Sequence, residues 1–132
     1  MSTTKESGTS YYIDDKWAER LEKGQKLADY AGRELDISDD VAAPKSTGYI
    51  VGKYESMPDG SWKGSGTCTY IDEGGDKLYE SWEEDSTKGT YKNTGGTGKY
   101  KGASGGGTYT LNAKGFTGPM SGGTYSGKIE LP

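Results

Sequence analysis

The stretch Gly96–Thr110, GTGKYKGASGGGTYT, constrains this chain most, because six of its fifteen residues are glycine and two are tyrosine. A helix is disfavoured, since each interior glycine costs about 1 kcal/mol relative to alanine. A phosphate-binding loop does not fit, because the glycine spacing departs from the dinucleotide fingerprint and the chain has no GxxxxGK[ST] motif. Strands of small barrels use glycine where the backbone bends or a neighbour comes close. The stretch therefore predicts two strands around a bend near residues 102–107, with both tyrosines packed on the interior or on one face.

Alternation with a period of two extends this pattern from Glu34 to the C-terminus and predicts strands with one buried and one wet face. The segments with this alternation are ELDIS, GYIVGKYE, WKGSGTCTYI, KLYESWEE and TYSGKIELP. Turn-forming runs separate several of them, namely MPDG at 57–60, DEGGD at 72–76 and NTGG at 93–96. The tripeptide Gly-Thr-Tyr recurs at 89–91, 107–109 and 123–125, a spacing that fits consecutive hairpins.

The N-terminal quarter has a different pattern. Residues 1–13 are mostly small and polar and predict a flexible tail. Residues 14–33 predict an amphipathic helix that covers one end or edge of the barrel. Its expected face is spaced at intervals of 4, 3, 4 and 3 and consists of Trp17, Leu21, Gly24, Ala28 and Ala31. The predicted organisation is therefore a tail at 1–13, a helix at 14–33 and a barrel at 34–132.

Composition narrows the possible functions. The chain has 132 residues, a formal net charge of −4, one cysteine and no histidine. This charge does not favour nucleic-acid binding, and the lack of histidine excludes Ser-His-Asp and Cys-His catalysis and the usual zinc sites. No apolar run reaches the length of a membrane span. No cofactor is expected, and the chain is expected to be cytoplasmic as written or exported after removal of a leader.

The run GTYKNTGGTGKYKGASGGGTYT (Gly89–Thr110) resembles a glycine-rich pattern in proteins related to the allene oxide cyclase and dirigent barrels, including small bacterial proteins. The resemblance covers roughly residues 48–131. It implies an eight-stranded antiparallel barrel of the calycin type with a central cavity. In the plant relatives such barrels cyclise or couple small organic molecules by holding them in shape, and bacterial members include cyclases of polyketide pathways. None of the families' catalytic residues maps onto a matched motif in this chain.

The predicted fold is thus an all-β, small eight-stranded antiparallel barrel with one N-terminal α-helix. Glu80 is the candidate catalytic residue, because it lies between Leu78 and Trp82 on a face that is expected to be buried. Inside a barrel, its pKa would rise by desolvation and it could act as an acid, a base or a polar anchor. An outward-facing register or an internal hydrogen bond to a tyrosine remains the alternative. The candidate ligand-binding residues are Trp62, Cys68, Tyr70, Leu78, Trp82, Tyr91, Tyr109 and Tyr125.

Two further groups have simpler interpretations. Cys68 has no activating histidine, so a buried inert thiol is favoured over a nucleophile. The acids of DEGGD at 72–76 do not have the spacing of an EF-hand loop and favour a solvated turn over a metal site.

Three functions remain open. The first is a binding module for a small, mostly apolar organic molecule, with a homo-oligomer possible. The second is a cofactor-free cyclase or isomerase that acts by holding a flexible substrate near its reactive geometry. The third is a barrel filled by its own side chains that has a structural role.

Overall fold

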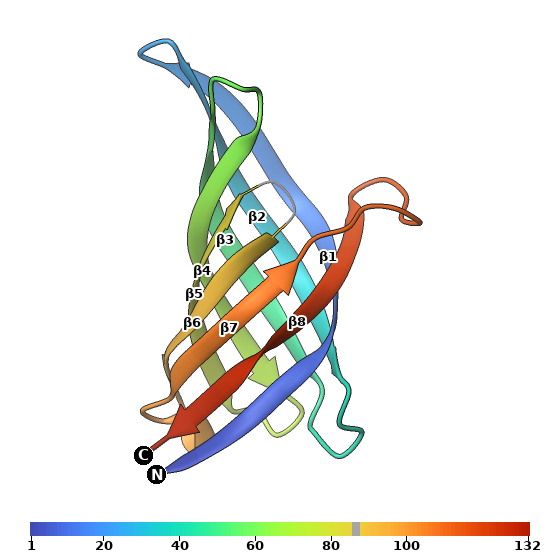
Figure 1. Ribbon diagram of the computed structural model, residues 1–132, viewed down its shortest axis with the longest axis vertical. Coiled ribbons are helices and arrows are strands. Elements are labelled where there is room, and N and C mark those ends of the chain that lie inside the picture. Colours follow the sequence, from blue (N-terminus) through green and yellow to red (C-terminus); the bar gives the residue numbers. More distant parts are fainter. Residues whose placement is uncertain (86–87) are drawn as a thin grey trace.

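The computed structural model describes residues 1–85 and 88–132, and it shows a closed barrel of eight antiparallel strands in chain order (Figure 1). The all-β barrel predicted from the alternation is confirmed. The strands are β1 (Ser2–Glu22), β2 (Gln25–Ser38), β3 (Ser46–Ser56), β4 (Trp62–Asp72), β5 (Lys77–Asp85), β6 (Lys88–Gly96), β7 (Ser104–Thr110) and β8 (Met120–Leu131). A short 3-10 turn, η1 (Gly98–Tyr100), follows β6.

Strand β1 closes the barrel because it pairs with two neighbours. Its residues 2–13 pair with β8, and its residues 8–22 pair with β2. The β1–β2 and β3–β4 hairpins extend beyond the other strands at one end of the barrel, and both chain termini lie at the opposite end (Figure 1). The closed ring removes the exposed strand edges that an open sheet of this size would present.

The predicted N-terminal helix is wrong. The segment 14–33 forms the end of β1 and the start of β2, and the described residues contain no α-helix. Residues 2–13, which we expected to form a loose tail, are paired along their whole length with β8. The barrel therefore begins at Ser2 and not at Glu34. Among the described residues, there is no helix that is long and apolar enough to cross a membrane.

Two local features explain why the spacing of apolar residues in these strands resembled that of a helix. The register of β1 against β2 shifts between Asp14 and Lys16, so Asp15 is an extra residue in a β-bulge. Before the bulge, the even-numbered residues Tyr12 and Asp14 face the cavity. After it, the odd-numbered Trp17 does, so the alternation with a period of two is broken. Gly24, which would be a weak point of a helix, belongs to the hairpin turn.

The turn between β1 and β2 consists of Lys23 and Gly24. Both have positive φ, 52° and 80°, and Glu22 pairs with Gln25 on either side. Positive φ at both central residues is the requirement of the two-residue type I′ turn, whose twist matches that of the flanking strands.

Glycine inside the barrel gives room to the large aromatic side chains. Gly52 on β3 pairs with Gly66 on β4, and the ring of Trp82 on β5 lies over both. A Cβ atom built at Gly52 would lie 2.3 Å from Cζ2 of Trp82, and one at Gly66 would lie 2.8 Å from the same atom. The indole of Trp82 therefore requires glycine at position 52, and at Gly66 the backbone oxygen of Val51 lies nearer still than the indole.

The glycine-rich stretch at residues 96–110 forms one strand and not two. After β6 ends at Gly96, η1 turns the chain, and only Ser104–Thr110 is extended, as β7. Of the predicted turns, 57–60 and 72–76 connect strands, whereas NTGG at 93–96 is the end of β6. Tyr109 faces the interior, and the hydroxyl of Tyr100 donates a hydrogen bond to Asp72 at the end of β4 (3.0 Å).

Candidate functional site

The interior of the barrel holds a cavity of about 690 Å³. This volume falls in the range of roughly 300–1,000 Å³ that is usual for sites that bind small molecules. The barrel is therefore not filled by its own side chains, although an eight-stranded barrel is narrow enough to be filled. The packed core is correspondingly small, with Tyr12, Ile50, Cys68 and Trp82 as its buried cluster.

Eight of the nine candidate site residues line this cavity. They are Cys68, Tyr70, Leu78, Glu80, Trp82, Tyr91, Tyr109 and Tyr125. Trp62 does not line it and instead packs edge-on against Trp17, with ring centroids 5.1 Å apart. The Cys68 thiol is free and 3% exposed, and burial and then the nearby Glu34 raise its pKa, which makes it a poor nucleophile.

A group of aromatic residues, of which only Trp82 was a candidate from the sequence, forms one end of the cavity. Tyr54 on β3 is its centre, with ring centroids 5.1 Å from Trp17, 5.8 Å from Tyr30 and 5.7 Å from Trp82. We call Trp17, Tyr30, Tyr54 and Trp82 the aromatic end. Trp17 and Tyr30 lie in the segment predicted as a helix, so their inward direction was hidden. Tyr54 follows Gly48, Ile50 and Gly52 in period two on one face of β3, which is the signal that could have identified it.

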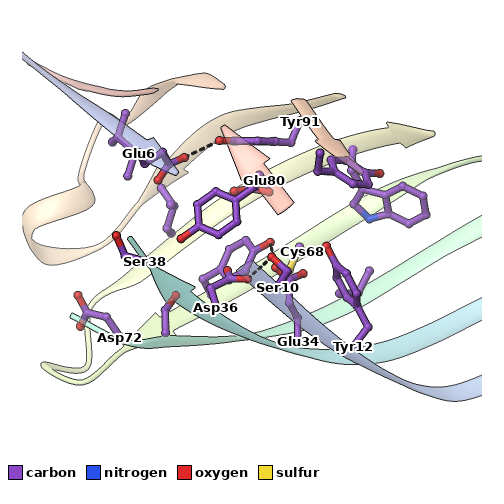
Figure 2. Close-up of a pocket in the computed structure, with 18 of the residues that line it drawn as sticks. Glu6, Ser10, Tyr12, Glu34, Asp36, Ser38, Cys68, Asp72, Glu80 and Tyr91 are labelled. Carbon is purple, nitrogen blue, oxygen red and sulfur yellow. Dashed lines mark hydrogen bonds between the residues drawn. The ribbon is translucent and has the colours of Figure 1, made fainter. Parts of the chain in front are cut away.

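Carboxyl groups also line the cavity, and Figure 2 shows a cluster of them in one region of it. This carboxyl cluster consists of Glu6 from β1, Glu34 and Asp36 from β2, and Glu80 from β5. Glu84 on β5 and Asp14 on β1 line the cavity toward the aromatic end, and Asp40, Asp72 and Asp76 also line it. Only Glu80 was predicted. Glu34 and Asp36 alternate with Leu35 and Ile37 in ELDIS, and here the aliphatic pair faces outward, 40% and 36% exposed.

Hydroxyl groups satisfy most of these carboxyls. The hydroxyl of Tyr91 donates to Glu6 (2.7 Å), that of Tyr70 to Glu34 (2.9 Å) and that of Ser10 to Asp36 (2.6 Å). Toward the aromatic end, Glu84 accepts hydrogen bonds from Tyr54 (2.7 Å) and Tyr109 (2.8 Å). The tyrosines thus form the cavity wall with their rings and bind the carboxyls with their polar tips.

The two carboxyls of Glu34 and Asp36 share a hydrogen bond. Burial, and then the charge of Asp36, raise the pKa of Glu34 well above its ordinary value of 4.5. Burial also raises the pKa of Asp36, while hydrogen bonds from Glu34 and Ser10 lower it. The pair therefore holds a proton more tightly than exposed carboxyls do, as expected when two acids are buried side by side.

Glu80 has a raised pKa for the same reasons. Burial has the largest effect, and repulsion by Asp36 and Glu6 adds to it. A register shift between β5 and β6 lies beside it, between Tyr79 and Glu80, and such bulges often re-aim a side chain next to a site. A carboxyl with these properties can keep its proton at a higher pH than an exposed carboxyl does, and it can donate this proton to a bound molecule.

Cationic side chains are scarce around this cavity. Among the described residues that line it, only Lys5 and Lys99 are cationic, and Lys99 forms an ion pair with Asp72. Within the same described residues, no group of three or more acidic or thiol side chains is placed to hold a metal ion. In the DEGGD turn, Asp72 instead accepts backbone hydrogen bonds from Gly74 (2.9 Å) and Asp76 (3.2 Å).

Comparisons with known proteins identify the fold. No protein-family model matches the sequence, and no curated protein matches it either. Among solved structures, the chain is similar to the pterocarpan synthase dirigent protein GePTS1, with a TM-score of 0.61 and 12% identity over 97% of this chain and 89% of that one. It is also similar to the pterocarpan synthase dirigent protein PsPTS1, with a TM-score of 0.60 and 14% identity over 97% and 94% of the two chains. The chain therefore has the eight-stranded barrel fold of dirigent proteins, as the resemblance in its glycine-rich run implied.

Proposed function

We propose that this barrel binds a small organic molecule in its central cavity. The observation that carries this proposal is an enclosed space of about 690 Å³ that has aromatic walls and a few convergent polar groups. The structural likeness to two pterocarpan synthase dirigent proteins supports the same class of ligand. The carboxyl cluster favours a ligand with at least one polar group, beside the mostly apolar body that the aromatic residues favour.

The proposal is tested with the protein as purified. Native mass spectrometry, followed by extraction, should reveal a retained organic compound, and the neutral dye Nile red should bind with a rise in fluorescence. Trp82→Leu, inside the cavity, should weaken dye binding several-fold, whereas Tyr49→Leu, on the exposed outer face of β3, should leave binding unchanged. A folded protein that retains no compound and gives no response to the dye would contradict the proposal.

A second candidate function is a cofactor-independent cyclase or isomerase. Glu80 and Glu34 favour it, because burial raises the pKa of both and both line the cavity. A protonated carboxyl held beside a bound substrate can act as a general acid, while the rigid walls restrict the substrate to a reactive conformation.

A comparison of extracts separates the carrier from the catalyst. If Glu80 takes part in catalysis, the compound from wild-type protein and the one from a Glu80→Gln variant would differ in chromatographic retention. Their masses would be equal for an isomerisation and would differ by one water for a cyclisation by condensation. The same compound in both extracts would favour the carrier.

A further inference from the structure

The carboxyl cluster contains more acceptor capacity than the protein satisfies. Its hydrogen-bond donors among the described residues are hydroxyl groups, from Ser10, Tyr70 and Tyr91. A phenol has one proton to donate, and Tyr70 gives its proton to Glu34, so its contact with Glu80 cannot supply a second one. The Glu80 carboxyl, enclosed by the barrel, is thus left with capacity for a donor that comes from a ligand (Figure 2).

The charge of the cluster is also unbalanced. Four acids from three strands converge there, and no ion pair in the described residues involves any of them. Lys99 is already paired with Asp72. The side chain of Lys5, which precedes Glu6 in the chain, is exposed. Buried acids without a cation are costly as carboxylates, so a positive group placed among them would gain both Coulomb energy and hydrogen bonds.

The cavity wall beside the cluster suits an organic cation better than a bare ion. Tyr12 and Trp82 are buried aromatic residues of the core cluster that also line the cavity. Aromatic faces attract cations and accept apolar surface, whereas hydrated metal ions prefer cages made of oxygen ligands. The described residues provide no such cage.

We propose that the ligand of this barrel is an organic amine, whose ammonium group lies among Glu6, Glu34, Asp36 and Glu80 and whose apolar body extends toward the aromatic end. This inference rests on the proposed function and specifies its ligand class. An ammonium group has three N–H donors, so it can bind two or three of these carboxyls at once. A carboxylate ligand of the same shape would be repelled by the same four acids.

Binding of an amine should release protons. In the free protein, burial raises the pKa of Glu34 and of Glu80, so both hold protons more tightly than exposed acids do. A cation within about 4–6 Å lowers the pKa of a carboxyl, and the displaced protons enter the buffer. Calorimetry in buffers with different ionisation enthalpies measures this release directly.

The test uses three probes with the same indole body and different head groups: tryptamine, tryptophol and indole-3-propionate. Isothermal titration calorimetry measures their affinities at neutral pH. Tryptamine should bind at least roughly tenfold more tightly than tryptophol, a ratio that corresponds to about 1.4 kcal/mol. Indole-3-propionate should bind more weakly than both, and tryptamine alone should show proton release.

A pair of variants on one strand tests the assigned acids. Glu80→Gln should reduce the preference for tryptamine over tryptophol at least roughly threefold, since it removes one of four acids while keeping size and shape. Glu83→Gln, the same change on the exposed face of β5, should leave the preference intact. Thermal unfolding confirms that both variants are folded.

The possible outcomes distinguish failure of the amine inference from failure of the proposed small-molecule binding. Equal or tighter binding of tryptophol or indole-3-propionate, or an unchanged preference in Glu80→Gln, would overturn the amine inference and leave small-molecule binding in place. Binding of Nile red without binding of any indole probe would do the same. Failure of Nile red and of all three indoles to bind would overturn both.

Discussion

At the scale of single residues, the interior is built from pairs of a tyrosine and a carboxyl group. Tyr54 with Glu84, Tyr70 with Glu34 and Tyr91 with Glu6 each join an aromatic wall to an acid through one hydrogen bond of 2.7–2.9 Å. The pairing lets a chain with only 30% hydrophobic residues line its interior with large rings. It also places acids in the interior, where most barrels have aliphatic side chains. Because a buried carboxylate lowers the free energy of unfolding, the stability of the protein depends on pH.

The stability of the ligand-free protein should fall as pH rises from 5 to 8. Burial and mutual repulsion raise the folded-state pKa of Glu80 and Glu34 above their ordinary value of 4.5, so the folded state binds more protons than the unfolded state in this range. Such groups contribute stability that is fully present below the unfolded pKa and is lost as pH rises through the folded pKa. Tyr70 on the neighbouring strand β4 faces Glu80, as do Glu6 on β1 and Asp36 on β2 from elsewhere in the barrel wall, and the two acids strengthen the effect. Urea unfolding at several pH values measures it.

The control is again a matched pair of variants. Glu80→Gln should flatten the decrease in the free energy of unfolding between pH 5 and 8, and Glu83→Gln should retain it. Surface acids such as Asp15 and Asp29 have lowered pKa values and act with the opposite sign, but only below pH 5. A stability that rises with pH over the tested range would contradict the raised pKa values.

At the scale of elements, the strands from β3 onward were largely predictable and the first two were not. In β4 and β5, alternation placed Cys68 and Trp82 on the buried face correctly, since both strands are regular there. In β1, the bulge at Asp15 shifts the inward face by one residue, and no feature of the local sequence indicates this bulge. In β2, the outward direction of Leu35 reverses the usual expectation, so its acidic neighbours were missed.

The hairpin that replaced the predicted helix has a testable turn. Lys23 is the only non-glycine residue with positive φ in the described chain, and Gly24 follows it with φ of 80°. Lys23→Asn should stabilise the protein by up to about 1 kcal/mol, because asparagine tolerates this conformation and favours type I′ turns. Gly24→Ala should destabilise it by roughly 1–2 kcal/mol. Urea unfolding checks both, and a gain in stability from Gly24→Ala, as a helix would show, would contradict the turn.

At the scale of the whole molecule, closure of the barrel depends on an N-terminal segment whose composition is typical of a flexible tail. Residues 2–10 are mostly small and polar, yet together with residues 11–13 they form the seam that joins β8 to β1. The cavity exists only because this seam is closed, so the fold and the candidate site depend on the same strand.

Deletion of residues 1–10 should therefore abolish the cooperative thermal unfolding of the barrel. The deletion removes the partners of β8 from Leu131 to Gly123 and leaves its edge exposed, which favours aggregation. The matched control adds ten glycine and serine residues before Met1, which lengthens the chain without breaking a pair and should leave the unfolding midpoint unchanged. Circular dichroism melting and size-exclusion chromatography provide the readouts. A truncated chain that keeps the elution volume and the midpoint of the full chain would mean that these residues are a tail after all, and that a barrel with a shortened β1 can hold the cavity without the seam.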